Sequence, residues 1–435
     1  MALPIQESTI ETLRKPPRKR SYTHHLTTTA AAQASSLALG VLSGVLAARL
    51  LGPQGRGELA ALTLWPATIV FLLSIGLNQS VVFHLGRNTF SLSHVWTAST
   101  VIGLGQSLLT VLAGLVVIPV ALRHYSHDVQ IMGFAVLAVS PLIILGGYPT
   151  SILQGRLDLI SFNLIQLASP CVYTAGVVVL ALMHRGHLQD VVIWRVSSYV
   201  FQFVLAYVLL LRRTVLRFNW HSGACLSLLG FGWKTELGNV SNYVNRYVDQ
   251  LVLSLFVPAH DLGLYAMAVT VALILNFIPT AAGMVALAAG SANAAEAAGM
   301  IGRSFRASLL WLLCGYGALF IAAPVLIIGI LGPAYAGSVL ACRILLPGAV
   351  AIGLNQVLYD GARALGDPAL ASYAEGCASL LTIVFLLLLL PRFGFVGAAI
   401  ASSVAYCGSL CVALALYKSR CGVRPSQLLL MAKPA

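Results

Sequence analysis

The sequence predicts an all-α, polytopic membrane protein of about 12 transmembrane helices in two pseudo-symmetric six-helix lobes. Three observations lead to this prediction. Charged residues make up only 9% of the 435 residues and hydrophobic residues 58%, whereas an ordinary soluble domain has roughly 25% charged residues. Apolar runs of about 20 residues, the length of helix that crosses a bilayer, recur from Leu26 to Tyr417. Glycine and proline landmarks repeat after 206 residues.

The predicted spans follow one another with short polar breaks. Gly52-Pro53, Arg212-Arg213 and Gly332-Pro333 carry the turn and end signals of these breaks. The breaks divide the chain into a basic tail (1–25), a first lobe (26–217), a second lobe (218–417) and a short tail (418–435). We expect the helices at 26–51, 59–86, 95–122, 129–153, 160–183, 190–211, 228–257, 262–290, 304–331, 338–364, 369–390 and 394–417.

Basic residues are distributed unevenly over the predicted loops. The chain has 26 Lys and Arg against 13 Asp and Glu. With the amino terminus inside, 17 basic residues lie in inner segments and 4 in outer loops. The positive-inside rule therefore places both termini in the cytoplasm and makes the cluster Arg14–Arg20 a topology signal. The net charge of +13 gives no reason to expect nucleic acid as a partner.

Several classes of activity lack their sequence signatures. The predicted loops are too short for a soluble catalytic domain, and there is no GxxxxGK[ST], HExxH or GxSxG pattern. The eight cysteines form no CxxC pair. We therefore predict no catalytic residue, no metal site, no cofactor and no enzymatic activity.

An internal repeat relates the two halves of the chain. Because each half holds six spans, both copies enter the membrane from the same side, and transporters with such parallel repeats bind substrate between the halves near the midplane. The alternative is that glycine and proline simply recur at helix ends and kinks. Gly40 and Gly44 also form a GxxxG motif, which predicts a close helix contact. The repeat rests on the pairs Gly57 and Gly263, Pro141 and Pro347, Gly147 and Gly353, and Gly155 and Gly361.

A polar stripe interrupts the seventh span. Thr235, Asn239, Asn242, Arg246 and Asp249 are spaced by four or three residues and share one face of a helix. An arginine near the bilayer centre costs about 2.5–3.5 kcal/mol and needs a partner or a watery cavity. An ion pair with Asp249 that only steadies the helix is one interpretation. We favour the other, in which the stripe forms the wall of a cavity.

Two further charged residues lie inside predicted spans. Arg343 is a second buried cation, which with Arg246 could bind an anionic group such as a lipid pyrophosphate. Its alternative role is pairing or snorkelling near the outer surface. Glu375, in the eleventh span, could take part in proton or sodium coupling.

Two stretches of the chain resemble the polysaccharide-exporting branch of the multidrug, oligosaccharidyl-lipid and polysaccharide exporter (MOP) superfamily, which includes O-antigen flippases. The segment 50–60, LLGPQGRGELA, is similar to the turn between the first two helices of those flippases. The segments 245–253, NRYVDQLVL, and 262–266, LGLYA, are similar to their seventh and eighth helices. These motifs are distinctive for the superfamily but not for one substrate.

The resemblance implies a flippase that moves a lipid-linked oligosaccharide or polysaccharide precursor across the bacterial inner membrane by alternating access. Its partners would be a polyprenyl pyrophosphate glycan, membrane lipids and a coupling proton or sodium ion. Arg246 and Arg343 would hold phosphate, and Asn239 and Asn242 would contact sugar. Asp249 would orient Arg246 or carry the coupling cation.

Four alternatives remain open, one of which is a membrane scaffold with no transport role, although midplane charges argue against it because a scaffold could use apolar residues at lower cost. A multidrug and toxic-compound cation antiporter shares the fold but needs carboxylates in its lobes, and the first six spans contain almost none. A peptidoglycan-precursor flippase is expected to have further helices. An integral-membrane glycosyltransferase or polymerase typically has a large outer loop, which this sequence lacks.

Overall fold

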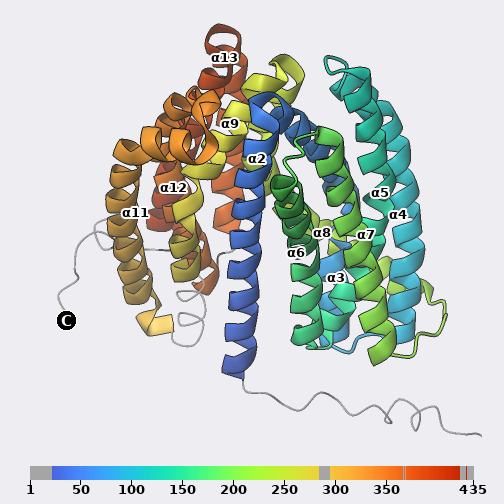
Figure 1. Cartoon of the computed structure of the whole chain (residues 1–435). Helices are drawn as coiled ribbons and strands as arrows, with labels where there is room; N and C mark the ends of the chain where they lie inside the picture. The colour runs from blue at the N-terminus through green and yellow to red at the C-terminus, as the bar shows by residue number, and fades with distance from the viewer. Residues whose placement is uncertain (1–21, 284–293, 366, 368, 422–427, 429–435) are drawn as a thin grey trace, which may run out of the picture. The chain divides into compact units, whose positions relative to one another are not determined.

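The computed structural model describes residues 22–283, 294–365, 367, 369–421 and 428. Over these residues the regular structure is helical, without strands (Figure 1). The predicted all-α fold is confirmed, while the basic cluster Arg14–Arg20 lies outside the described residues. The helices are α2 (Tyr22–Ser74), α3 (Leu77–Gly86), α4 (Leu92–Ala121), α5 (His127–Gly155), α6 (Leu159–Leu182), α7 (Leu188–Arg213), α8 (Ser222–Phe256), α9 (Ala259–Ala272), η1 (Ile274–Asn276), α11 (Ala294–Leu331), η2 (Pro333–Tyr335), α12 (Ser338–Ala364) and α13 (Ala369–Arg420).

The helices account for the predicted number of spans. Nine segments of the described chain are long and apolar enough to cross a membrane. Two of the nine, α2 and α13, contain a non-helical residue, Gly52 and Gly394 respectively, so each consists of two helices joined across a kink. The more polar α8 has 35 residues and is also long enough to span. Counting the two kinked helices twice and adding α8 gives 12 spans.

Three breaks between helices fall where the sequence predicts them. Two predicted spans, 59–86 and 262–290, are instead interrupted, the first at Ile75-Gly76 and the second at η1. Gly52 has a φ of 66° and is followed by Pro53, whose fixed φ suits the start of the next helix. Gly332 has a φ of 102° and is followed by Pro333. α7 ends at Arg213. These boundaries are confirmed.

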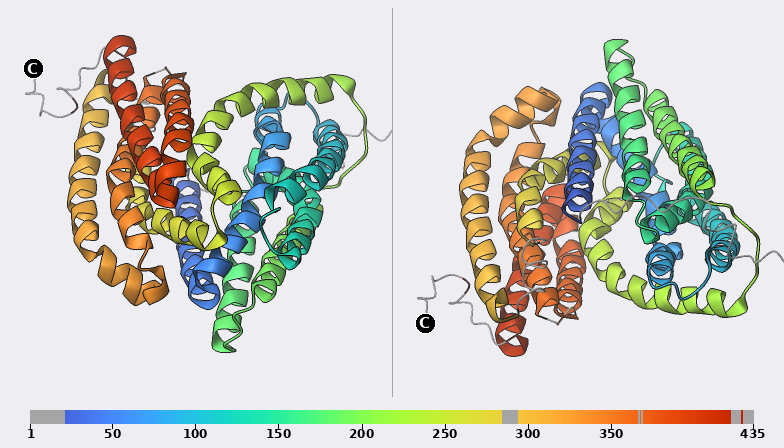
Figure 2. Two further views of the ribbon diagram at one scale, coloured as in Figure 1. Left: turned by 90° about the horizontal axis from the view of Figure 1, so that it is seen from above. Right: turned by 90° about the horizontal axis from the view of Figure 1, so that it is seen from below.

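The described residues divide into two compact units, here called unit 1 and unit 2. Unit 1 holds the described residues of Met1–Leu46, Pro66–Ile118 and Ile131–Glu236, and unit 2 those of Ala47–Trp65, Pro119–Gln130 and Leu237–Ala435. In unit 2, α12 packs against α9, α11 and α13, and the orange and red segments α11 to α13 lie side by side in both views of Figure 2.

Unit 1 has an apolar core to which α3, α4, α5, α6, α7 and the start of α8 contribute. Its fully buried members include Leu77, Val81, Ile152, Ile165 and Leu210. α6 and α7 pack against each other.

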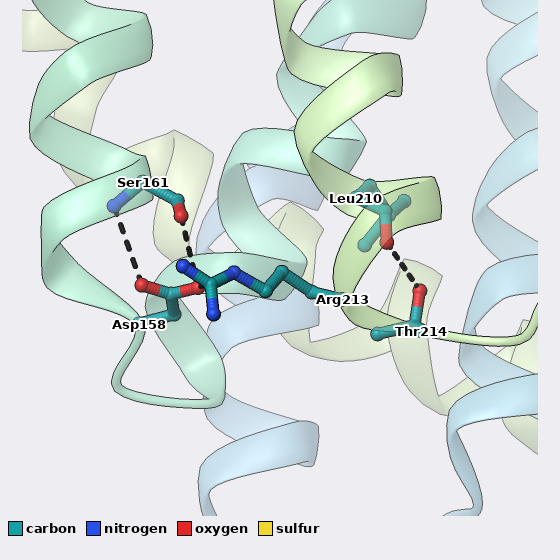
Figure 3. A network of polar contacts seen from close by, with 5 residues as sticks. All are labelled: Asp158, Ser161, Leu210, Arg213 and Thr214. Atoms are coloured by element: carbon teal, nitrogen blue, oxygen red, sulfur yellow. Dashed lines mark hydrogen bonds and ion pairs between the residues drawn. The ribbon is translucent and has the colours of Figure 1, made fainter. Parts of the chain in front are cut away.

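A polar contact fixes the ends of these two helices (Figure 3). The carboxylate of Asp158 caps α6 by accepting hydrogen bonds from the N–H of Ser161 at 3.3 Å and from its hydroxyl at 2.9 Å, and it pairs with Arg213 at 3.5 Å.

The second half of α2 crosses α9 within unit 2, at two glycines. A Cβ on Gly57 would lie 2.6 Å from the carbonyl carbon of Ala259, and a Cβ on Gly263 would lie 2.8 Å from that of Pro53, closer than real Cβ atoms approach. Gly263 and Ala259 are the residues 206 positions after Gly57 and Pro53. The contact is therefore reciprocal, as it is across a two-fold axis. This geometry supports the internal repeat.

A second landmark pair has the same surroundings in each unit. A Cβ on Gly147 would lie 2.9 Å from the side-chain oxygen of Asn78 in unit 1, and one on Gly353 would lie 2.7 Å from that of Asn276 in unit 2. Each glycine thus makes room for an asparagine side chain.

The GxxxG prediction was wrong. A Cβ on Gly40 or Gly44 would meet no described atom within 4 Å, so these glycines form no close helix contact in the described part of the chain.

Candidate functional site

The polar stripe predicted on the seventh span lies on α8. From Asn239 onward it belongs to unit 2. Asn239 is half-buried and Asn242 is exposed, and neither side chain has a hydrogen-bond partner among the described residues. Arg246 lies about 15 Å from the end of the helix at Phe256, because an α-helix rises about 1.5 Å per residue.

The guanidinium of Arg246 is exposed and forms no ion pair with a described residue. It lies within electrostatic range of the carboxyl group of Glu375 on α13 and of the phenol of Tyr406. Because Glu375 is near Arg246 but forms no ion pair with it, the N–H donors of the guanidinium remain available to an anionic ligand.

Asp249 lies one turn after Arg246 but is directed elsewhere. Its side chain is 2% exposed. One carboxylate oxygen accepts hydrogen bonds from the hydroxyls of Tyr265 and, at 3.0 Å, Ser402, and the other accepts the N–H of Gln250 at 2.7 Å. The helix-steadying ion pair between Asp249 and Arg246 is therefore absent from the described chain, and Asp249 instead joins α8 to α9 and α13.

Glu375 belongs to a neighbouring polar group in unit 2. Its carboxylate accepts a hydrogen bond from the side-chain amide of Asn245 at 2.6 Å and lies close to the hydroxyl of Tyr359, which bonds to the hydroxyl of Ser409 at 3.0 Å. The hydroxyl of Tyr406 donates to the carbonyl of Asn245 at 3.0 Å. Asn245 lies four residues before Asp249, so one stretch of α8 contacts both the buried Asp249 and the half-buried Glu375. Their hydrogen-bond partners are neutral donors.

Arg343 lies apart from this polar group. Near the start of α12, its Nε donates to the carbonyl of Phe320 on α11 at 3.0 Å, and its guanidinium stands 4.8 Å from the centre of the Phe320 ring. Arg343 therefore contacts α11, and no contact between Arg343 and Arg246 is found in the described chain.

Unit 1 contains a cavity of about 730 Å³. Its lining comes from α3, α5, α6, α7 and α8, and it includes five carboxamide side chains, four phenylalanine rings and no charged residue. The volume falls within the range of ordinary small-ligand sites. Thr235, the first residue of the predicted stripe, belongs to this lining. The carboxamides are Asn78, Gln79, Gln154, Gln166 and Gln202.

Close helix packing shapes one wall of the cavity. Gly76, with a φ of 58°, precedes α3 and packs against Gly232 of α8. A Cβ on Gly76 would lie 3.2 Å from the backbone nitrogen of Glu236. This approach places Phe231 and Thr235 of α8 beside α3 in the cavity wall.

Sequence reasoning missed two groups of residues. It gave no site role to Asn245, Tyr265 or Ser402, because its search for site residues considered only charges and one helical face; Asn245 and Tyr265 entered only as part of the segments that resemble the family. It also missed the cavity amides, since Gln154 and Gln166 are single polar residues on different helices and no one segment stands out. Glutamines scattered over otherwise apolar spans were the available signal.

A family model described as "Polysaccharide biosynthesis protein" matches residues 45–340, more than half of the chain. The chain belongs to this family. No curated protein matches it in sequence. A polysaccharide biosynthesis protein with these helices is a multi-pass membrane protein.

Solved structures share the fold of this family member at low sequence identity. One is "Lipid II flippase MurJ, inward closed conformation", with a TM-score of 0.74 and 16% identity, covering 90% of this chain and 87% of that one. An inward-facing multidrug resistance MATE family transporter of the MOP superfamily has a TM-score of 0.75 and 13% identity, with coverages of 93% and 100%. A MOP superfamily transporter from Pyrococcus furiosus has a TM-score of 0.60 and 13% identity, with coverages of 91% and 94%. The chain thus has the MOP superfamily fold, as the sequence resemblance implied.

Proposed function

We propose that the chain flips a lipid-linked oligosaccharide or polysaccharide precursor across the bacterial inner membrane by alternating access. Arg246 is the observation that carries this proposal. Its exposed guanidinium lies deep along a membrane helix and has no ion-pair partner in the described chain. A cation in that position is costly unless it binds something. The phosphate groups of a lipid-linked glycan fit it, and the family and fold support this passenger.

The predicted site residues take the following roles in this proposal. Arg246 and Arg343 bind phosphate at separate points, while Asn239 and Asn242 present unpaired amides to sugar hydroxyls. Glu375 carries or orients a coupling proton or sodium ion.

Asp249 has a structural role in this proposal and does not contact the passenger. Its buried carboxylate is fully hydrogen-bonded, and it positions α8 against α9 and α13. The passenger crosses without covalent chemistry.

The proposed topology has both termini in the cytoplasm and two lobes, 26–217 and 218–417, that move during transport. The excess of basic residues in the predicted inner segments supports this orientation. The described connections between helices are short, the longest running from 214 to 221. They hold no domain of the kind that a membrane glycosyltransferase would need.

The cation antiporter is less well supported. A cationic passenger needs a carboxylate at its binding site, and the unit 1 cavity has none in its lining. The exposed Arg246 would repel such a passenger at a site in unit 2.

The experiment measures stranded intermediates in cells. Deletion of the gene should leave a polyprenyl-linked glycan on the cytoplasmic face, and plasmid-borne wild type should clear it. Arg246→Ala should fail to clear it while reaching the membrane at the wild-type level, and Arg246→Lys should retain part of the activity because it keeps the charge. Arg185→Ala, in a loop, is the matched control and should behave as wild type. Normal clearance by Arg246→Ala would refute the assignment of Arg246, and altered drug sensitivity without a stranded glycan would favour the antiporter.

A further inference from the structure

The unit 1 cavity has a lining rich in hydrogen-bonding groups and free of charge. Nine of its side chains carry a carboxamide or a hydroxyl, and no Asp, Glu, Lys, Arg or His is among its lining residues. Carboxamides both donate and accept hydrogen bonds, as do hydroxyls. Such a lining suits a ligand that is itself uncharged and rich in hydroxyl groups.

Some of these groups are held in place by the protein. The side-chain oxygen of Asn78 accepts a hydrogen bond from the hydroxyl of Ser151 at 3.1 Å, which leaves its amide nitrogen to donate. The amide nitrogen of Gln202 donates to the carbonyl of Ile165 at 3.2 Å, which leaves its oxygen to accept. The two amides are thus oriented before any ligand enters.

Other groups in the lining have no partner. The side chains of Gln79, Gln154, Gln166 and Tyr199 make no hydrogen bond with another described residue. Gln79 and Gln166 are exposed and Gln154 and Tyr199 are half-buried, so all four are open to the space of the cavity. On a membrane-spanning helix a polar side chain without a partner is costly, and an apolar residue at the same position would avoid that cost. Their presence on membrane helices therefore indicates that the cavity receives a polar occupant.

The cavity lining also contains aromatic rings, on which the apolar C–H face of a sugar can pack. The rings of Phe83 and Phe231 stack with a centroid distance of 4.1 Å and an interplanar angle of 19°. Each of these two rings has one face covered by the other, so the C–H face of a sugar ring would pack on an uncovered face among the four lining phenylalanine rings while its hydroxyls reach neighbouring amides. A cavity of about 730 Å³ has room for more than one sugar ring.

A charged sugar would lack a counter-ion inside this cavity. An ionised carboxylate or ammonium buried without a partner is penalised far more than a hydroxyl. One cation contacts a lining residue: the guanidinium of Arg87 stands 4.6 Å from the centre of the Phe83 ring. Arg87 is exposed and is not among the lining residues.

We propose that the unit 1 cavity is a binding site for uncharged sugar units and that it selects neutral over acidic glycans. This inference rests on the proposed function, because it takes the passenger to be a glycan. It adds the chemical class of sugar and a second site, in a different unit from Arg246.

The test uses the full chain purified into lipid nanodiscs and three soluble probes: neutral maltotriose, acidic tri-galacturonate and the cation tetraphenylphosphonium. Binding is measured by calorimetry and by saturation-transfer NMR. We expect maltotriose to bind at least about tenfold more tightly than tri-galacturonate, because the acid loses solvation without gaining a partner. Equal binding of the two trisaccharides, no binding of maltotriose, or binding of tetraphenylphosphonium alone would overturn the proposal.

A variant locates the binding. Gln154→Leu combined with Gln166→Leu keeps the approximate volume and removes two unpaired amides, and it should weaken maltotriose binding by about tenfold. Gln189→Leu, at an exposed position outside the cavity, is the matched control and should bind as wild type. Unchanged binding in the double variant would overturn the location. If the double variant does not fold, the comparison of the three probes on the wild-type protein still tests the selectivity.

Failure here is distinguishable from failure of the proposed function. A chain that clears the stranded intermediate in cells but does not discriminate between the trisaccharides remains a flippase with a different sugar site. A chain that clears no intermediate refutes the flippase, whatever the probes do.

Discussion

The crossing of α2 and α9 gives a quantitative prediction, because both close approaches are to backbone atoms. In Gly57→Ala the new Cβ would lie 2.6 Å from the carbonyl carbon of Ala259 and 2.9 Å from the nitrogen of Gly263. No side chain can rotate away to relieve this. The new Cβ would also overlap the carbonyl oxygen of Ala259, so the two helices must separate by more than about 1 Å. A gap of about 1 Å already forfeits roughly a quarter to a half of the dispersion attraction across the contact.

The cost should lie at the upper end of the range for overpacked sites, about 3 kcal/mol. A change of 1 kcal/mol shifts the melting temperature of a domain of 150–250 residues by roughly 2–4 °C, and a longer chain shifts less because its unfolding entropy is larger. For the 435 residues of this chain we therefore expect a loss of a few degrees, below about 6 °C. The assay is thermal unfolding of detergent-purified protein, followed by size-exclusion chromatography of the remaining folded fraction.

Gly40→Ala is the matched control, because its Cβ meets no described atom within 4 Å. Replacing glycine by alanine inside a helix gains about 1 kcal/mol in helix propensity, so this variant should be neutral or slightly more stable. Gly263→Ala should resemble Gly57→Ala, and the double variant should cost less than the sum, since the first substitution already separates the helices. A Gly57→Ala protein as stable as Gly40→Ala would refute the reasoning.

Three further predictions concern single polar contacts. Tyr265→Phe removes a donor from the buried carboxylate of Asp249 and should lower the free energy of unfolding by about 1–3 kcal/mol in thermal unfolding; wild-type stability would show that the hydrogen bond contributes nothing. Asp158→Ala removes the N-cap of α6 and should lower the free energy of unfolding by about 1 kcal/mol in the same assay. Unchanged stability would show that this cap does not stabilise the helix. Burial and the neighbouring carboxylate of Asp367 raise the pKa of the Cys421 thiol, so its reactive thiolate forms at higher pH than in a free cysteine. Asp367→Asn should therefore move the alkylation profile of Cys421, measured by peptide mass spectrometry, to lower pH, and an unmoved profile contradicts the electrostatic cause.

The helices were predictable because their signals are local. Gly52-Pro53 and Gly332-Pro333 end one helix and start another through backbone preferences that depend on those residues alone. The length of each apolar run reflects the thickness of the bilayer. These rules place the boundaries without any knowledge of tertiary packing.

The contacts of individual side chains could not be predicted, because they depend on which helices pack against each other. Helical spacing puts Arg246 and Asp249 on one face of α8, yet Arg246 is exposed and Asp249 buried, because Tyr265 and Ser402 from other helices cover the latter. Gly40 and Gly44 have the spacing of a contact motif, but a Cβ at either position would meet no atom of the described residues within 4 Å. Helical spacing identifies which residues share a face of a helix. Which other helix packs against that face is determined by the tertiary fold.

The unit 1 cavity illustrates the same limit. Gln79, Gln154, Gln166 and Gln202 come from four helices, and each is a minor feature of its own span. Only the packing of α3, α5, α6 and α7 makes them neighbours.

The reciprocal glycine contact also bears on how the chain could have originated. Gly57 contacts Ala259, and the repeat equivalents of these two residues, Gly263 and Pro53, contact each other in the same way. Two identical chains make paired contacts of this kind in a symmetric homodimer. A gene encoding six helices could therefore have produced a self-associating half before duplication and fusion joined the two copies. In that case the link at residues 214–221 is a later addition. Two halves expressed from separate genes, cut within this link, should still associate through the crossing at Gly57 and Gly263.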